Sequence, residues 1–413
     1  MRFFTLLLLL LALFACRQKE VPPPAALVQR AEYEPTRAVW MQWPNYVHRA
    51  DMPLEPLLLE MLAALAPHTP VRLLAPNDSV RAYLQILLPS RGFDTSRIRL
   101  LILPYSEFWA RDMGPRFLSD GKGRKAIADF GFNTWSYLDA GDSLAQLDEK
   151  LDERIAAHLG LPLLSSDLIA EGGDNEVSAE GVLMLTESVQ RLRNPALSRA
   201  QIEKEYTRLL GVKYFIWLDK GLRDDDFSLA GPIPGPGGRR LFTCLTTNGH
   251  VDEYARFAND STILLARGDT AATDPIERES ARRMLANYKI LARARRPSGR
   301  PYRIVPVPLV PAITAPMGPG DGPYDFLAGR ELEDGSRFGV RRQPENMVAA
   351  ASYLNFVIAN DLLLAPRYGL PGDSAALNAF RTAFPEKKII LLNPLALNWG
   401  GGGMHCITAN EPH

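Results

Sequence analysis

Residues 54–75 read LEPLLLEMLAALAPHTPVRLLA, an amphipathic stretch followed directly by a short aliphatic run. The apolar side chains of the first part recur at helical spacing on one face: Leu54, Leu57, Leu58, Met61, Leu62 and Leu65. This spacing predicts a helix over residues 54–66. The run at 71–75 is short and bounded by turn residues, which predicts a buried strand.

The same alternation continues along the chain. Further strands are predicted at 98–103, 214–218, 262–266, 355–365 and 388–392, and further helices at 198–210, 274–296 and 373–384. The helix at 198 opens with a capping box of Ser198 and Gln201, and the helix at 274 opens with Asp274 before Pro275. Strands interleaved with helices predict an α/β fold. No internal repeat is found by matching letters.

The composition excludes several classes of protein. The chain has 413 residues, of which 46% are hydrophobic and 23% are charged, as in ordinary globular proteins. Lys plus Arg and Asp plus Glu both number 47, so no basic excess indicates nucleic acid as a partner. Six His and three Cys leave no framework of zinc ligands or disulfides.

The first residues, MRFFTLLLLLLALFAC (1–16), form a separate unit. The apolar run is too short to span a bilayer and fits a secretory signal. Leu13-Phe14-Ala15-Cys16 resembles a bacterial lipobox, so we expect a signal peptide over 1–15, lipid attachment at Cys16 and a Pro-rich tether over 16–30. The catalytic domain would then cover 31–413, held on the membrane of a bacterial cell envelope. A plain signal peptide is the alternative.

Three long segments are rich in Gly and Pro: 223–248, 297–346 and 399–406. They are predicted to be irregular, and loops of this length in a compact domain are usually functional or mobile.

Four short motifs could carry chemistry: WARDMGP (109–115), EGGDNE (171–176), GHVD (249–252) and GGGGMHCIT (400–408). Each one alone is weak. If 249–252 is extended, His250 and Asp252 point to the same face and can act together. Four consecutive glycines before Cys406 suit a backbone that must approach a ligand closely. Cys244 lies in an aliphatic stretch and is predicted to be structural.

Taken together, these motifs resemble the agmatine deiminase and bacterial (porphyromonad-type) peptidylarginine deiminase family of guanidine-modifying enzymes. The other matching pieces are WMQWP (40–44), DFGFNTW (129–135), RNPALS (193–198) and SYLNFVIAN (352–360). The resemblance implies a five-bladed α/β propeller of the pentein type, built of ββαβ units around a central active site.

The resemblance also implies a reaction, the hydrolysis of a guanidinium to a ureido group with release of ammonia. Cys406 would be the nucleophile and His250 the general acid and base. Asp112 and Asp252 would bind the guanidinium, and Glu171 would be a further carboxylate near the histidine. Trp135 and Gly403 would also contact the substrate. The scheme requires no metal and no organic cofactor.

The substrate stays open between agmatine, free arginine and an arginine-containing peptide. Ser106 and Glu107 stand where agmatine enzymes usually carry two aspartates, and no arginine lies at 132–135. An export signal favours a peptide, and Arg341 or Arg342 would attract its carboxylate if either reached the pocket; both could equally be surface charges. The oligomeric state stays undetermined.

Two other functions compete with the deiminase. An amidinotransferase of the same superfamily would share the covalent cysteine step but would pass the amidino group to an amine. A catalytically inactive lipoprotein would only bind guanidinium or peptide. Release of ammonia separates the first alternative from a deiminase.

Overall fold

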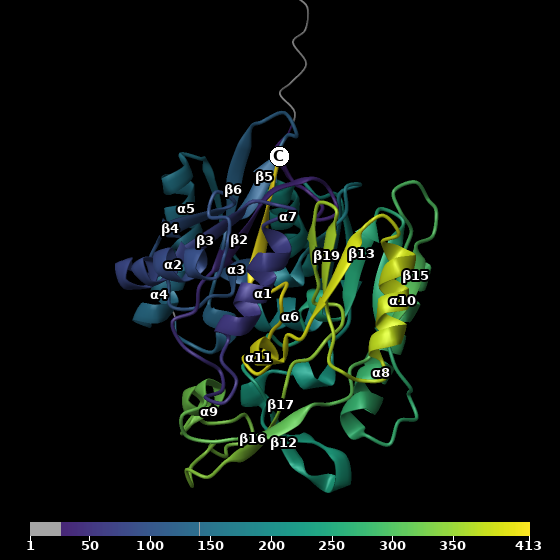
Figure 1. Ribbon diagram of the computed structural model, residues 1–413. Coiled ribbons are helices and arrows are strands. Elements are labelled where there is room, and N and C mark those ends of the chain that lie inside the picture. The colour runs from purple at the N-terminus through teal and green to yellow at the C-terminus, as the bar shows by residue number, and fades with distance from the viewer. Residues whose placement is uncertain (1–25, 140) are drawn as a thin grey trace, which may run out of the picture.

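The computed structural model describes residues 26–139 and 141–413, whose strands form five sheets of one repeated arrangement and a sixth sheet of different order. In each repeated sheet an antiparallel pair of strands is followed by helix and a third strand that runs parallel to the second. This confirms the predicted propeller of ββαβ units. The helices lie toward the outside and the strands toward the middle, as α2, α8 and α10 show in Figure 1.

The bounds of the five repeats are as follows. The first holds β21 (Thr408–Pro412), β2 (Thr36–Gln42), α1 (Glu55–Leu65) and β3 (Val71–Ala75), extended by α2 (Asp78–Ser90) and β4 (Ile98–Ile102). The second holds β5 (Arg116–Ser119), β6 (Lys125–Gly131), α4 (Ser143–Glu149), α5 (Leu151–Leu159) and β7 (Leu163–Ile169). The third holds β8 (Glu176–Val177), β9 (Val182–Thr186), α6 (Glu187–Arg193), α7 (Arg199–Leu210) and β10 (Tyr214–Leu218). The fourth holds β13 (Ala255–Asn259), β14 (Thr262–Arg267), α8 (Pro275–Arg293) and β15 (Arg303–Pro308). The fifth holds β18 (Val357–Ala359), β19 (Leu362–Pro366), α10 (Asp373–Ala383) and β20 (Lys388–Leu392).

The sixth sheet corrects the prediction that the long Gly/Pro-rich segments are irregular. Its strands come from these segments, in the order β11 (Ile233–Pro234), β12 (Arg240–Thr243), β17 (Glu345–Val348) and β16 (Thr314–Met317). The short helix α9 (Gly322–Leu327) lies beside it at the lower end of the molecule in Figure 1. Proline does not prevent these strands, because short strands tolerate it at positions that need no ladder hydrogen bond.

The apolar face predicted for residues 54–66 is buried, and α1 packs against β19 and β20 of the neighbouring repeat. The capping box of Ser198 and Gln201 is present at the start of α7. The single strand predicted at 355–365 is wrong. It is a hairpin of β18 and β19, and the chain turns at Asn360 in the left-handed region with φ 54°. Asparagine is one of the few residues that adopts this conformation at low cost.

The N-terminal arm, residues 26–35, belongs to the folded body. Val28 and Gln29 form β1, which pairs antiparallel with Ser119 and Leu118 of β5. The expected tether over 16–30 is therefore too long by at least the residues of this strand. The expected signal peptide and Cys16 lie outside the described residues.

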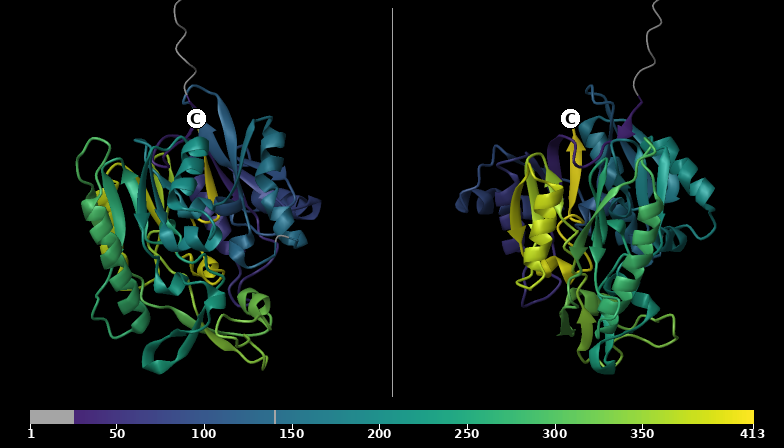
Figure 2. Two further views of the ribbon diagram at one scale, coloured as in Figure 1. Left: turned by 180° about the vertical axis from the view of Figure 1, so that it is seen from behind. Right: turned by 90° about the vertical axis from the view of Figure 1, so that its right-hand side faces the viewer.

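The arm and β21 end at one side of the molecule, and the sixth sheet lies at the opposite side, as two further views also show (Figure 2). Within the described residues, no helix combines the length and apolarity needed to cross a bilayer.

Candidate active site

One short segment from each repeat, just before its first strand, reaches the centre of the propeller. The residues that these segments bring together are Asp112 of α3 (Ala110–Met113), Asp174 of η2 (Gly172–Asp174), Asp252 of η6 (Val251–Glu253), Asn355 and Cys406. All five side chains are buried. Arg111 ties two of the segments together, because its backbone N–H donates to the carbonyl oxygen of Cys406 at 2.9 Å. The repeat thus explains why residues so far apart in the sequence share one site.

Gly173 leaves open the space that these side chains surround. A Cβ atom placed on it would lie 2.5 Å from His250 Nδ1, 3.0 Å from Asp112 Oδ1 and 3.2 Å from Asp252 Oδ2. Its backbone N–H donates to Asp112 Oδ1 at 2.9 Å and fixes that carboxylate. Any side chain at this position would fill the centre, so the Gly-Gly pair of the EGGDNE motif is required by space.

Buried polar atoms without a hydrogen-bond partner gather around this space. Among the described residues they include Glu171 Oε2, Arg193 Nη1, Asp252 Oδ1 and both ring nitrogens of His250. Buried polar groups in folded proteins are almost always paired, since an unpaired one costs about 1–3 kcal/mol. A cluster of exceptions around one space indicates that a polar ligand completes the pairing.

Glu171 is held by an arginine that the sequence analysis did not assign to the site. Arg193 Nε lies 2.5 Å from Glu171 Oε1, and Arg193 Nη2 donates to the carbonyl oxygen of Thr247 at 2.9 Å. Burial raises the pKa of Glu171, but the charges of Arg193 and His250 outweigh it and lower the pKa to about 2. The signal in the sequence that could have identified Arg193 was its place at the start of the RNPALS motif. A buried arginine needs a carboxylate partner, and Glu171 is that partner.

His250 lies between two carboxylates, 3.8 Å (Nδ1) from Asp112 Oδ1 and 3.5 Å (Nε2) from Glu171 Oε2. Burial lowers the pKa of His250, but the charge of Asp112 and the charge and proximity of Glu171 outweigh it and raise the pKa to about 10. The ring is therefore an imidazolium at neutral pH. The condition that 249–252 is extended is not met, because residues 251–253 form a 3-10 turn. His250 and Asp252 still face the same space, because the turn itself points both inward.

The Cys406 thiol lies among acids and amide donors. Sγ is 3.7 Å from Asp252 Oδ2 and from Glu253 Oε1, and it accepts from Asn355 Nδ2 at 3.2 Å and from the backbone N–H of Gly403 at 3.4 Å. Burial, and then the charges of Asp252 and Glu253, raise the pKa of this thiol well above its usual value. Gly403 thus contacts the sulfur.

The glycine run before Cys406 is needed for its backbone. Gly401 has φ 95°, and a Cβ atom on it would lie 2.0 Å from the carbonyl oxygen of Leu245. Only glycine combines that conformation with so close an approach. The run therefore delivers the thiol to the centre through a turn that other residues could not form.

Asn355 connects the acids to the thiol. Besides Sγ, its Nδ2 contacts Glu253 Oε1 at 2.9 Å and Asp252 Oδ2 at 3.3 Å, and its Oδ1 accepts from the backbone N–H of His405 at 2.8 Å. Sequence reasoning missed Asn355 and Glu253 as site residues. The His405 ring turns away from the sulfur, and its Nδ1 lies 2.6 Å from Asp252 Oδ2.

Among residues 26–139 and 141–413, two groups of side chains have donor atoms close enough to surround a cation, Asp252–Glu253–Cys406 and Glu32–Glu176–His405. Each already contacts a hydrogen-bond donor of the protein. The Asn355 amide serves the first group, and the Arg256 guanidinium contacts every member of the second.

Trp135 joins the centre to a larger cavity. Its Nε1 donates to Asp112 Oδ2 at 2.8 Å, and Thr134, Trp135 and Ser136 all have positive φ. Such a conformation at three non-glycine residues is strained and is typical of functional sites.

The cavity has a volume of about 490 Å³. The residues that line it are Tyr46, Val47, His48, Glu107, Trp109, Thr134, Trp135, Tyr137, Leu245, Gly320, Gly322, Pro323, Asp325, Phe326 and Gly400. Part of this lining, between residues 320 and 326, comes from the Gly/Pro-rich segment 297–346. Arg341 and Arg342 are exposed and do not line the cavity, so they are surface charges. Cys244 is fully buried in an apolar cluster, as predicted.

Comparison with known proteins agrees with the geometry. The sequence model of the Porphyromonas-type peptidyl-arginine deiminase family matches residues 28–231 and 240–412. The chain belongs to this family. It is 32% identical over 394 residues to the agmatine deiminase of Stutzerimonas stutzeri A1501, covering 92% of this chain and 94% of that protein. The agmatine deiminase of Pseudomonas aeruginosa LESB58 is 28% identical over the same share of both chains.

A solved structure shows the same fold. The agmatine deiminase of Enterococcus faecalis superimposes with a TM-score of 0.74 at 24% identity, covering 94% of this chain and 96% of that one. Family membership makes the chain a hydrolase that acts on amidine C–N bonds.

Proposed function

We propose that this hydrolase converts the guanidinium of a small substrate to a ureido group and releases ammonia, with Cys406 as the nucleophile. Two observations carry the proposal. His250, Asp112 and Asp252 border the space in front of Gly173, and His250 and Asp252 have buried atoms without a hydrogen-bond partner. The thiol Sγ lies 3.7 Å from Asp252 Oδ2. A guanidinium is planar, permanently charged and rich in donors. Asp112 and Asp252 would bind it as paired carboxylates do, and Asp252 Oδ1 would gain its missing partner.

Substrate binding would activate the thiol. In the free protein the acids around Cys406 disfavour the thiolate, and His250 already carries its proton. A guanidinium cation held between Asp112 and Asp252 offsets those negative charges and lowers the thiol pKa. The nearest acceptors for the leaving proton are Asp252 Oδ2 and Glu253 Oε1. Substrate binding therefore shifts the thiol toward the thiolate.

The chemical steps then balance as follows. The thiolate attacks the central carbon of the guanidinium, and the tetrahedral adduct is neutral. His250 donates its proton to one amino group, which leaves as ammonia, and a cationic thiouronium remains on Cys406. Neutral His250 next takes a proton from water, and the hydroxide adds to the same carbon. The C–S bond then breaks to give the thiolate, and the hydroxyl proton passes to the released ammonia or to solvent, which leaves the neutral ureido product.

The cavity favours a substrate whose other end is a cation. Glu107 and Asp325 are the two acids in its lining, and no arginine or lysine lines it in the described part of the chain. Burial raises the pKa of Glu107 to about 7, so an approaching ammonium would favour its ionised form. We therefore place agmatine, the compound named by the relatives, before arginine peptides. This reverses the preference expected from the export signal and Arg341.

The test is an assay of ammonia and of the ureido product with agmatine, free arginine and arginine peptides, each at several concentrations. Wild type should release both products at equal rates, and agmatine should give the largest kcat/KM. The assay is repeated with an added amine acceptor. Amidino transfer to that amine without ammonia would replace a deiminase with an amidinotransferase, and no product from any guanidinium would overturn the proposal.

A further inference from the structure

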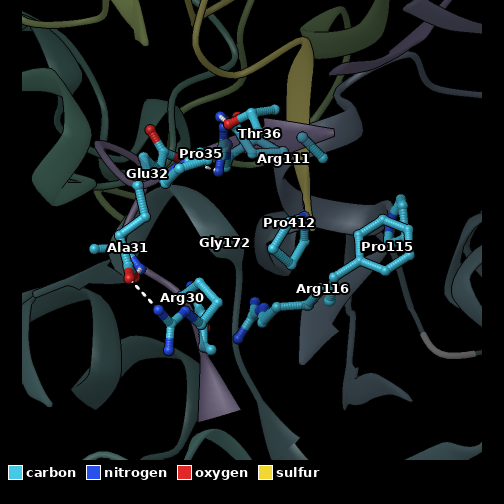
Figure 3. A pocket seen from close by; sticks show the side chains of 15 residues that line it. Arg30, Ala31, Glu32, Pro35, Thr36, Arg111, Pro115, Arg116, Gly172 and Pro412 are labelled. Atoms are coloured by element: carbon cyan, nitrogen blue, oxygen red, sulfur yellow. Dashed lines mark hydrogen bonds and ion pairs between the residues drawn. The ribbon is translucent and has the colours of Figure 1, made fainter. Parts of the chain in front are cut away.

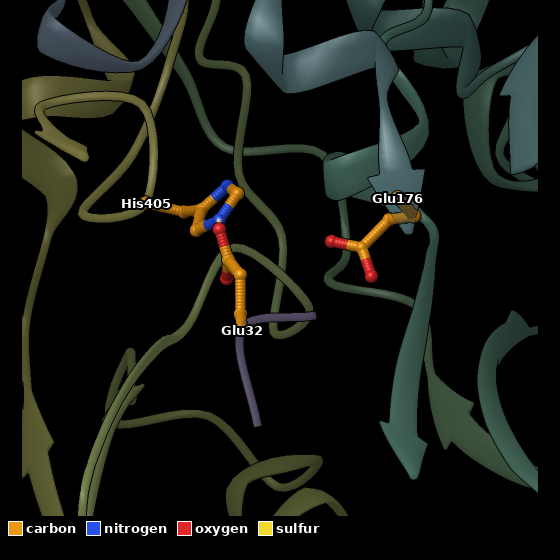
Figure 4. A group of neighbouring side chains, drawn as sticks. All are labelled: Glu32, Glu176 and His405. Atoms are coloured by element: carbon orange, nitrogen blue, oxygen red, sulfur yellow. Dashed lines mark hydrogen bonds and ion pairs between the residues drawn. The ribbon is translucent and has the colours of Figure 1, made fainter. Parts of the chain in front are cut away.

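Glu32 of the N-terminal arm lies behind the centre, on the side away from the substrate cavity. Its carboxylate oxygens lie 2.9 Å from His405 Nε2, and one of them accepts from Arg256 Nη2 at 2.8 Å. Arg111 Nη1 forms a further ion pair with it. Figure 4 shows the Glu32 carboxylate against the His405 ring, with Glu176 facing it across the gap.

The three partners of Glu32 come from three different repeats. Arg111 directly precedes Asp112, and His405 directly precedes Cys406. Arg256 lies on β13, four residues after Asp252. The Glu32 side chain thus contacts three residues that lie close in the sequence to Asp112, to Asp252 and to Cys406. The Arg256 side chain is fully buried and that of Glu32 is 17% exposed, so solvent screens these contacts little.

His405 relays this contact to the centre. One ring nitrogen faces Glu32, and the other lies 2.6 Å from Asp252 Oδ2, the same oxygen that lies 3.7 Å from the sulfur. A carboxylate that contacts one ring nitrogen of a histidine fixes the orientation of the ring. Glu32 therefore orients His405, and His405 in turn orients Asp252. The Asp252 carboxylate, whose Oδ2 borders the space in front of Gly173, is thereby held in position.

The arm also closes this end of the axis. The space between it and the body is only about 40 Å³, and it is lined by Arg30, Glu32, Arg111, Arg116, Gly172 and Pro412 among others (Figure 3). That volume accepts little more than water. The arm is held in place by β1 and by Tyr33, whose hydroxyl donates to Asp260 at 2.6 Å. A substrate therefore has to enter from the opposite cavity.

We propose that Glu32 is a positioning residue of the active site, which acts through His405 to hold Asp252 against the substrate. The proposal rests on the proposed function, because the reaction supplies the main readout. Glu34 offers a matched control. It lies on the same arm with a similarly buried carboxylate, but it contacts Arg30 and the backbone N–H of Ala31 and does not reach His405.

The first measurement is steady-state kinetics with agmatine at pH 7.5, with melting temperature as a check on folding. Glu32→Gln should lower kcat by roughly ten- to a hundredfold with KM changed less than about threefold, as a displaced reacting group does. Glu34→Gln should stay within about twofold of wild type in both. On a His405→Gln background, Glu32→Gln should add less than about threefold, because residues of one network are not additive. Equal effects of the two glutamates, or a Glu32 effect that persists undiminished in the double variant, would overturn the inference.

The second measurement does not need turnover. The alkylation rate of Cys406 by iodoacetamide is followed against pH by peptide mass spectrometry. The groups that face Glu32 are Arg111, Arg256 and His405, with Glu176 across the gap. Removing one negative charge here favours the thiolate, so Glu32→Gln should move the midpoint to lower pH. Glu34→Gln and Glu32→Asp, which keeps the charge, should match wild type.

The outcomes separate the two proposals. An unchanged midpoint in Glu32→Gln overturns the positioning role whatever the activity. A wild type that releases no ammonia from any guanidinium overturns the proposed function alone.

Discussion

The centre of the propeller and the ion cluster behind it contain similar side chains, but they differ in how these are paired. Around Gly173, Glu171, His250 and Asp252 each leave buried polar atoms without a hydrogen-bond partner. Behind it, the side-chain polar atoms of Glu32, Glu176 and His405 all have partners. A completed network fixes positions, whereas an incomplete one leaves interactions for a ligand to make. The residues with incomplete pairing are the ones that we propose to act on the substrate, and the residues with complete pairing hold them in position.

The largest effect is expected at the thiol, the group on which the comparison depends most. Cys406→Ser should lower kcat by more than about 10³-fold, because loss of a nucleophile removes most of the acceleration. Agmatine should still bind, since Asp112 and Asp252 remain, and calorimetry measures this. Intact mass spectrometry should find a substrate adduct in wild type only. Cys244→Ser is the matched control and should keep its activity; an adduct on Cys244 would contradict the assignment.

The pH dependence tests the pairing of His250. Its pKa is raised from 6.5 to about 10 by acids that include Glu171, so kcat/KM should stay high until an alkaline fall near pH 10. Glu171→Gln removes one of these charges and should move that fall down by about one pH unit, a change equivalent to about 1.4 kcal/mol. A fall that stays in place would show that Glu171 does not set the protonation of His250.

The same shift predicts a trend in stability. Because the folded-state pKa of His250 is higher than the unfolded one, its contribution is complete below about pH 6.5 and is lost as the pH rises through about 10. Urea unfolding of wild type and Glu171→Gln across this range measures it, and the variant should lose less stability on the alkaline side.

A smaller effect is expected in the outer cavity, where Glu107 is one of two acids in the lining. Glu107→Gln should lower kcat/KM for agmatine by roughly tenfold, because a hydrogen bond to a charged group contributes about 1.5–3 kcal/mol. The value for an arginine peptide should change little. The double change Arg341→Ala and Arg342→Ala should leave the ratio of the two substrates unaltered, because both arginines lie outside the lining. If the double change lowered kcat/KM for the arginine peptide relative to agmatine, our choice of substrate would be reversed.

The smallest effect on turnover is expected at the N-terminus. We propose that Cys16 carries a lipid, because it ends an apolar run that resembles a lipobox. Wild type made with its own signal in a bacterium should partition into detergent and gain the mass of acyl groups at Cys16. Cys16→Ala should be found in the aqueous phase with an unchanged kcat. A wild type that partitions like Cys16→Ala would refute the anchor.

The sequence predicted the elements well where periodicity was strong, and it predicted the site only through whole motifs. The strands at 71–75, 214–218 and 388–392 have the predicted bounds, because short aliphatic runs between turns have few alternatives. The hairpin at Asn360 was missed, although FANDSTILLA (257–266) and VIANDLLLAP (357–366) repeat one Asn-Asp turn between two strands. Aligning these two stretches would have indicated the repeat.

The remaining site residues could not be found from their local sequence. Arg193 and Asn355 lie in motifs that carry the family resemblance, but nothing beside them in the sequence shows what they contact, and Glu32 lies in no motif. All three matter because the closed propeller brings them to one centre. The conformation around His250 could not be predicted for a similar reason. Residues two apart in the sequence point to the same face only on a strand. The 3-10 turn here depends on distant acids: Asp225 accepts from the backbone N–H of Gly249, and Asp174 accepts from that of Val251.

The pairing of β21 with β2 has a consequence for how the protein is made. These neighbouring strands are separated by about 370 residues of chain, so at about 5–20 residues per second the ribosome needs tens of seconds between them. During that interval the edge of β2 is unpaired and exposed to aggregation. The thiol of Cys406 directly precedes β21, so synthesis completes the first sheet and the centre in the same step. A nascent chain would therefore carry carboxylates from the second, third and fourth repeats for some time before it has the sulfur that they surround.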